Sequence, residues 1–143
     1  MRIRQATNPS EPGLRELWEM LSAETDDYDP LPSSPFDELD AGFVRYVAEE
    51  DGGLVGCVYA NLVGNGVVFV FGLFVRPEAR RKGVGKALME AILDDARKRL
   101  NEHAILTVET PNAGARALYK SMGFVEHSVG LRIELAGADP AET

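Results

Sequence analysis

An apolar run that ends at a basic, glycine-containing turn constrains this chain more than any other feature. Residues 67–75 carry no charge, Pro77 stops the run, and Arg80-x-x-Gly83-x-Gly85 follows. A strand that is apolar on both faces is typical of the interior of a sheet. Beyond the glycines, apolar residues recur at helical spacing. The sequence therefore predicts a central strand over 67–75, a tight turn, and a helix over 83–100.

This strand, turn and helix together predict an anion site. The first turn of a helix has unpaired N–H groups and the positive end of the helix dipole. Gly83 and Gly85 have no Cβ, so the backbone can approach a phosphate closely. The basic residues Arg80, Arg81, Lys82 and Lys86 surround the turn. A solvated basic turn is the alternative, but the glycine spacing favours a cradle for a diphosphate.

Two common phosphate-binding patterns are absent. The segment lacks Gly-x-x-x-x-Gly-Lys-Ser/Thr, the loop of many nucleotide-binding proteins, and it lacks the dinucleotide fingerprint Gly-x-Gly-x-x-Gly. The predicted pyrophosphate ligand is therefore not expected to bind through either of these two patterns.

A second segment lies downstream and narrows the choice. It reads Asn112-Ala113-Gly114-Ala115-Arg116-Ala117-Leu118-Tyr119-Lys120-Ser121-Met122-Gly123-Phe124. The two segments, in this order, resemble the acyl-CoA signature and the Asn-x-x-Ala-x-x-Leu-Tyr-x-x-x-Gly-Phe segment of the GNAT superfamily of N-acetyltransferases. The resemblance covers roughly residues 1–135, although the N-terminal third matches only in the order of its elements.

The resemblance implies an α/β (α+β) GNAT fold, a mixed twisted sheet of about six to seven strands flanked by about four helices. The expected order is βααβββαβαββ. Hydrophobic patterning places strands at 2–6, 43–48, 54–63, 67–75, 105–109, 124–127 and 131–135, with further helices from Leu14, at 36–40 and from Asn112. We expect one domain over 1–135 and a flexible tail over 136–143.

Composition limits the class of ligand. The chain has 143 residues and a net charge of −8, with thirteen acidic and four basic side chains in residues 1–51. A strongly acidic protein with one basic patch is a poor nucleic-acid binder but suits a small anionic cofactor. The acidic residues either favour a cationic second substrate or only maintain solubility.

Other features point to an ordinary soluble globular protein. The only cysteine, Cys57, lies in an apolar stretch, which predicts a buried structural thiol. No apolar run is long enough to span a bilayer, so we expect no membrane partner and a cytoplasmic protein. His103 and His127 fall in no metal-ligand spacing, so no metal site is expected.

By resemblance, acetyl-CoA is the cosubstrate. The backbone amides from Arg81 to Lys86 would hold its diphosphate, and the preceding strand would pair with the pantetheine arm like an added strand. Asn112 would cap its helix and also contact the pantetheine. The cofactor-binding residues expected are Leu73, Phe74, Val75, Arg80, Arg81, Lys82, Gly83, Val84, Gly85, Lys86 and Asn112.

The resemblance also implies that Tyr119 is the general acid, which donates a proton to the departing CoA sulfur. A phenol with a pKa of about 10 is protonated at neutral pH and suits a thiolate with a pKa of about 8.5 or somewhat higher. The alternative is an aromatic residue on the core face of a short helix. Leu118 and Met122 already supply that face, which favours the catalytic role.

The general base is where this sequence departs from its relatives. The family often has a glutamate in the central strand, where Phe69 stands here, or in the next strand, where Thr107 stands. Glu109 would share a face with Thr107 in a strand, so it is the candidate base, directly or through water. A surface carboxylate at a strand end is the alternative for Glu109, and a chain of water molecules could also serve as the base. Glu24, Asp26, Asp27 and Tyr28 would line the acceptor pocket and bind a cationic amine.

We therefore expect an N-acetyltransferase that transfers the acetyl group of acetyl-CoA to a primary amine of a small molecule or peptide. The amine would attack directly in a ternary complex. A non-catalytic acyl-CoA sensor that has lost its base is the alternative from another class. An alcohol or a protein terminus as acceptor also stays open, and the family allows a homodimer.

Overall fold

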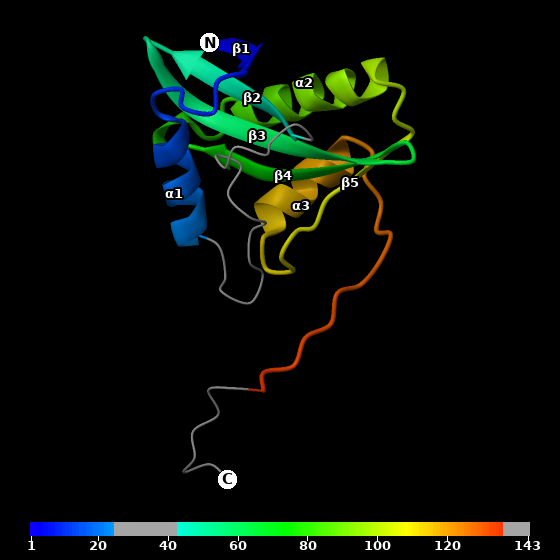
Figure 1. The fold of residues 1–143 in the computed structure, drawn as a ribbon. Helices are drawn as coiled ribbons and strands as arrows, with labels where there is room; N and C mark the ends of the chain where they lie inside the picture. The colour runs from blue at the N-terminus through cyan, green and yellow to red at the C-terminus, as the bar shows by residue number, and fades with distance from the viewer. Residues whose placement is uncertain (25–42, 136–143) are drawn as a thin grey trace, which may run out of the picture. The chain divides into compact units, whose positions relative to one another are not determined.

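The computed structural model describes residues 1–24 and 43–135 (Figure 1). It divides into two compact units, Met1–Glu109 and Thr110–Thr143. The elements of the first unit are β1 (Arg2–Gln5), α1 (Leu14–Glu24), β2 (Phe43–Glu50), β3 (Gly53–Gly64), β4 (Val67–Val75), the 3-10 helix η1 (Pro77–Ala79), α2 (Val84–Lys98) and β5 (His103–Ile105). The second unit contains α3 (Ala113–Ser121).

The first unit is built on a mixed sheet of five strands in the order β1-β2-β3-β4-β5. Strands β1 to β4 are antiparallel to their neighbours, whereas β5 runs parallel to β4. A parallel neighbour requires a crossover connection, and α2 provides it. Strand β4 lies between β3 and β5, as its apolar sequence predicts.

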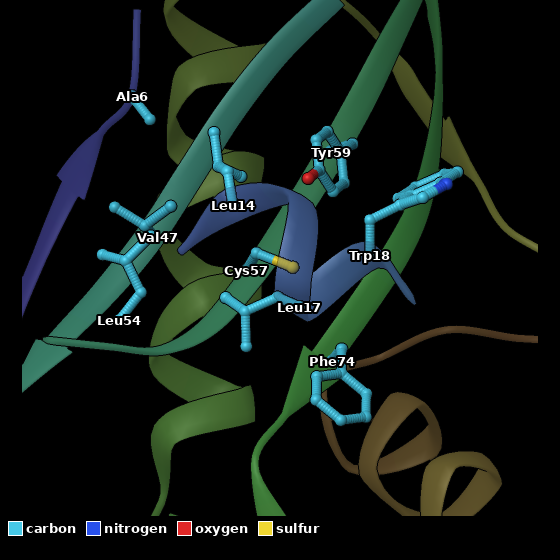
Figure 2. Packing of buried hydrophobic residues seen from close by; sticks show 9 residues of the cluster. All are labelled: Ala6, Leu14, Leu17, Trp18, Val47, Leu54, Cys57, Tyr59 and Phe74. Atoms are coloured by element: carbon cyan, nitrogen blue, oxygen red, sulfur yellow. The ribbon is translucent and has the colours of Figure 1, made fainter. Parts of the chain in front are cut away.

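Helices cover both faces of this sheet (Figures 1 and 2). Helix α1 packs Leu14, Leu17 and Trp18 onto a buried cluster that includes Cys57 and Tyr59. The Tyr59 ring lies 5.4 Å from Phe71 in a stacked arrangement, and Trp18 meets it edge-on at 5.3 Å. Helix α2 covers the other face with its own buried row, Val84, Leu88, Met89, Ile92 and Ala96.

A bulge interrupts β4 at Gly72, whose φ is +69°. Tyr59 pairs with Phe71, whereas Cys57, two residues back on β3, pairs with Phe74, three residues on along β4. A Cβ at Gly72 would lie 2.6 Å from Cδ1 of Tyr59, so the close approach and the positive φ both require glycine. The bulge bends β4 just before the predicted cofactor site.

The expected elements are confirmed for most of the first unit, but β5 differs at both ends. It spans His103–Ile105, so residues 106–109 are not part of the expected strand 105–109. The expected helix 36–40 lies outside the described residues.

The second unit keeps the expected helix but not the expected strands. Asn112 caps α3 by accepting a hydrogen bond from the Ala115 N–H at 3.1 Å, and Gly123 follows the helix with φ +96°. Residues 124–127 and 131–135 form no strand. A strand needs a neighbour for its backbone groups, and their apolar side chains are exposed: Val125, Leu131, Ile133 and Leu135. The prediction of two last strands is therefore wrong for this structure, and the described residues form five strands and three α-helices.

Candidate cofactor site

The end of β4 presents an open main-chain edge. Strand β5 pairs with β4 only at Val67–Phe69, so on the edge opposite β3 no described strand pairs with residues 70–75. The Arg76 N–H donates to the Val55 carbonyl of β3 at 2.8 Å. The Val75 carbonyl belongs to the same trans peptide group as the Arg76 N–H and so points the opposite way, toward the open edge. Val75 and, by alternation, Leu73 thus have main-chain groups on the open edge, whereas those of Phe74 face β3.

The turn after β4 adopts an unusual backbone conformation. After η1, Arg81 has φ +65° and Gly83 has φ +82°, both in the left-handed region. A non-glycine residue seldom adopts this conformation, and it marks a backbone shaped for a purpose beyond joining two elements. Successive N–H groups in such turns form concave sites for anions.

Helix α2 begins without a side-chain cap. Its N-cap is Gly83, which has no side chain to accept a hydrogen bond, and its first turn contains no acidic residue. The N–H groups of Val84, Gly85 and Lys86 therefore lack the partners that a cap or the helix itself would supply. A Cβ at Gly83 would meet no atom within 4 Å, so the surface above the turn is open.

Three basic side chains surround this helix start. Arg81, Lys82 and Lys86 are exposed, and none of them forms an ion pair with another described residue. Their charge adds to the positive end of the α2 dipole. The turn and helix start that the sequence predicted as an anion cradle are thus brought together.

Arg80 differs from its basic neighbours because its guanidinium is already engaged. Its Nε donates to the Val75 carbonyl at 2.8 Å, and its Nη2 contacts both carboxylate oxygens of Glu24 at 2.9 and 3.1 Å. Its Cζ lies 5.4 Å from the centre of the Phe74 ring. The Arg80 side chain therefore connects the turn to the end of β4 and to the last residue of α1.

Tyr119 lies in the second unit, on α3. Its ring is half-buried and meets the Phe124 ring edge-on, with centroids 5.7 Å apart. Burial raises the pKa of Tyr119 above the ordinary phenol value. Among the described residues, no side chain of α3 is fully buried. The role of Tyr119 as general acid stays a prediction, and so does the alternative of a core aromatic residue.

The candidate base lacks the geometry on which its prediction depended. Glu109 is half-buried and lies beyond the end of β5, where no strand alternation relates it to Thr107. In β4 the position at which the family often has a glutamate is occupied by Phe69, which is 42% exposed. The identity of the base therefore stays a prediction.

Of the predicted acceptor residues, only Glu24 is described. It is the last residue of α1 and forms the ion pair with Arg80. Asp26, Asp27 and Tyr28 lie outside the described residues.

Sequence reasoning missed two residues of this region. Gly72 produces the bulge, and an isolated glycine in an apolar strand is the signal that could have indicated it. No sequence signal marks Arg76, whose Nε donates to the Leu54 carbonyl at 2.8 Å and whose Nη1 contacts Glu16 at 3.3 Å.

Other site types find no support in the described parts of the chain. No group of three or more His, Cys, Asp or Glu side chains in residues 1–24 and 43–135 is placed to hold a metal ion. Within the same residues, no helix combines the length and apolar character needed to cross a membrane.

The mixed sheet, the open edge of β4, the left-handed turn and the uncapped helix start together form the kind of site that the sequence predicted for a diphosphate-bearing ligand. The sequence profile of the acetyltransferase (GNAT) family matches residues 12–124. This chain belongs to the acetyltransferase (GNAT) family, as its two motifs predicted.

Individual relatives agree with this assignment. N-alpha-acetyltransferase RimI of Mycobacterium tuberculosis is 36% identical over 119 residues, which cover 78% of this chain and 72% of the relative. The [ribosomal protein bS18]-alanine N-acetyltransferase of Escherichia coli is 40% identical over 60 residues, and the match spans only 42% of this chain and 40% of that relative's length.

Solved structures share the fold at low identity. A putative acetyltransferase from Agrobacterium tumefaciens has a TM-score of 0.72 and 21% identity, covering 94% of this chain and 100% of that one. Aminoglycoside N-acetyltransferase AAC(6')-Iy, in complex with CoA, has a TM-score of 0.71 and 22% identity, with the same coverage. The GNAT fold is thereby established for this chain.

Proposed function

We propose that this protein is an N-acetyltransferase that moves the acetyl group of acetyl-CoA to a primary amine. The observation that carries the proposal is the continuous path from the open edge of β4, through the left-handed turn at Arg81 and Gly83, to the uncapped start of α2. Membership in an acetyltransferase family makes acetyl-CoA the expected donor.

Each part of this path would hold one part of the donor. The free N–H groups of Val84, Gly85 and Lys86, with Arg81 and Lys82, would bind the diphosphate. The open-edge groups of Leu73 and Val75 would pair with the amides of the pantetheine arm. Arg80 already occupies the Val75 carbonyl, so the Val75 N–H and the Leu73 groups remain for this pairing.

The proposed chemistry is direct transfer. The unprotonated amine nitrogen attacks the thioester carbonyl carbon, a C–N bond forms, and the C–S bond breaks. Tyr119 would give its phenolic proton to the departing thiolate, and its raised pKa keeps that proton on the oxygen at neutral pH. The proton that the acceptor ammonium loses before attack would pass to water or to Glu109. The second proton, which the nitrogen loses as the amide forms, would return through water to the Tyr119 phenolate.

For the acceptor we favour the α-amino group of a peptide or protein. The names of the mycobacterial and E. coli relatives describe Nα-acetylation and acetylation of a ribosomal protein alanine. The acidic N-terminal third of this chain would attract a cationic acceptor. Asp26, Asp27 and Tyr28 remain candidates to bind it.

A non-catalytic acyl-CoA sensor is the second candidate, and one observation favours it. Strand β4 contains no carboxylate, and an exposed phenylalanine, Phe69, stands where relatives often have a base. The cradle would then bind acetyl-CoA without supporting transfer.

The deciding experiment mixes the purified protein with acetyl-CoA and a panel of amines and follows the release of free CoA thiol. The panel contains peptides with free N-termini, matched N-blocked peptides with lysine, polyamines and aminoglycosides. Thiol release that requires a free N-terminus supports the proposed acceptor, and release with another amine class replaces it.

Thermal unfolding separates the two candidate functions. Acetyl-CoA at about 100 times its Kd should stabilise the fold by about 2.7 kcal/mol. Stabilisation without thiol release on any amine supports the sensor. If acetyl-CoA does not raise the melting temperature at all, the cradle assignment is wrong.

A further inference from the structure

One face of α1 contacts the segment that leads into the cradle. Glu16, Met20 and Glu24 follow one another at intervals of four residues, so they lie along one side of the helix. The guanidinium of Arg76 contacts Glu16 at 3.3 Å and the Met20 sulfur at 3.6 Å. The guanidinium of Arg80 contacts Glu24 through both carboxylate oxygens.

The two arginines bracket η1. Arg76 immediately precedes Pro77 and Arg80 immediately follows Ala79. Arg76 also binds the Leu54 carbonyl of β3, and Arg80 binds the Val75 carbonyl at the end of β4. Each arginine therefore connects α1, the sheet and the start of the turn.

Of the two arginines, Arg80 lies nearer in sequence to the left-handed turn. It lies next to Arg81, whose φ of +65° is unfavourable for a residue with a side chain. Such a conformation persists only where neighbouring contacts fix it. The Glu24 carboxylate fixes the far end of the Arg80 guanidinium, while the Val75 carbonyl and the Phe74 ring fix the near end.

We propose that Glu24 is a positioning residue for acetyl-CoA. It holds Arg80 in the arrangement that keeps the left-handed turn ready to receive the diphosphate. This inference rests on the proposed function, and it replaces the expected role of Glu24 in the acceptor pocket. The carboxylate does not touch the donor, because a negative charge beside a diphosphate would oppose binding.

The proposal concerns affinity and not folding. The Glu24 and Arg80 side chains are 51% and 43% exposed, and an exposed ion pair contributes little to stability. Releasing Arg80 from Glu24 would leave a long side chain and its turn to be ordered at the moment of binding. That ordering weakens affinity, by about three- to tenfold for one or two side chains.

The test measures acetyl-CoA binding directly by calorimetry, together with steady-state kinetics. Glu24→Gln should bind acetyl-CoA about three- to tenfold more weakly and raise its KM by the same factor. Its kcat, its KM for the acceptor and the melting temperature of the unliganded protein should stay unchanged. Glu19→Gln is the matched control, because it removes the same charge from the same helix and Glu19 contacts neither arginine; it should bind like the wild type.

A double-mutant cycle tests the pair itself. The double variant Glu24→Gln with Arg80→Gln should bind acetyl-CoA no more weakly than Arg80→Gln alone, because Glu24 acts only through Arg80. Unchanged or tighter acetyl-CoA binding by Glu24→Gln overturns the inference, and so does a rise in the acceptor KM alone. If the wild-type protein itself does not bind acetyl-CoA, the proposed function fails, which is a different result.

Discussion

At the scale of single residues, Gly72 occupies a site with no room for a side chain. The Tyr59 ring lies where a Cβ would be, and Trp18 Cζ3 would be 3.2 Å away. Gly72→Ala should therefore destabilise the fold by more than about 3 kcal/mol, because left-handed strain and overpacking add. Equilibrium unfolding in denaturant measures this loss.

Gly64→Ala is the matched control for that prediction. Gly64 has φ +90°, but a Cβ there would meet no atom within 4 Å. This variant should lose only about 1–2 kcal/mol, the cost of the left-handed backbone. Equal losses in the two variants would contradict the role given to the Tyr59 contact.

Tyr119→Phe tests the proposed general acid. A general acid must be protonated, so activity should hold through neutral pH and decline only as the pH rises through the Tyr119 pKa. Burial raises that pKa above the ordinary phenol value, which moves the alkaline limb of the kcat profile to higher pH. The Phe variant should lose about 100-fold or more in kcat and lose the alkaline limb, with acetyl-CoA affinity retained. An unchanged pH–rate profile would remove Tyr119 from the mechanism.

Gly83→Ala separates binding from folding at the cradle. The added methyl group meets no protein atom, so only the left-handed backbone should cost stability, about 1–2 kcal/mol. The same methyl group would stand where the diphosphate must approach the α2 amides. We expect acetyl-CoA affinity to fall by more than tenfold, measured by calorimetry below the melting temperature of the variant. Wild-type affinity would mean that the diphosphate does not bind against this turn.

At the scale of elements, a hydrogen bond connects α2 to the sheet beneath it. The Tyr46 hydroxyl of β2 donates to Oδ2 of Asp95 at 2.8 Å. Burial and this bond raise the pKa of Tyr46 to about 12. Tyr46→Phe should destabilise the fold by about 1 kcal/mol, measured by denaturant unfolding. The stability of the wild type should fall as the pH rises toward about 12, because the folded state keeps the Tyr46 proton that the unfolded state loses. The Phe variant should lack this fall. Equal pH dependence in the two proteins would contradict the role given to the hydrogen bond.

The elements also show what a sequence can predict. Strand β4 and helix α2 were predictable because their apolar periodicity is long and their boundary contains proline and glycine. The Gly72 bulge depends on the Tyr59 ring of the neighbouring strand, which no local pattern reveals. Strand β5 ends at Ile105 because pairing and not propensity decides where a short strand stops, and this removed the basis for placing Glu109.

Residues 131–135 illustrate the same limit. They alternate apolar and charged side chains, the pattern of a half-buried strand. In the structure their apolar side chains are exposed and no strand forms. Alternation indicates which side chains would share a face, but a neighbouring strand must be present for the backbone to pair.

At the scale of the whole molecule, charge is distributed in a way that suits two substrates of opposite sign. The chain carries a net charge of −8, yet the turn before α2 is basic. We expect kcat/KM for a cationic peptide acceptor to fall as ionic strength rises from about 0.01 M to about 0.15 M, because the Debye length shrinks from about 30 Å to about 8 Å. Rates measured across this range with a cationic and a neutral acceptor test the idea, and equal slopes would contradict it.

The family and the cofactor class could be predicted from two short motifs, whereas the acceptor could not. The motifs specify backbone geometry around the donor, which a sequence records as glycines and caps such as Gly83 and Asn112. An acceptor site depends on side chains from several segments, whose combined shape no single stretch of sequence defines. The proposal that Asp26 and Asp27 belong to it therefore stays a prediction.

The burial of Cys57 has a practical consequence for experiments on this protein. Its thiol is fully buried and contacts the Gly72 carbonyl, and burial raises its pKa to about 12. Thiol reagents react with the thiolate, so the folded protein should remain unlabelled while free CoA reacts at once. The rate at which this single cysteine is slowly labelled would then measure how often the sheet opens beneath α1. One thiol assay could therefore follow both CoA release and local opening of the native core.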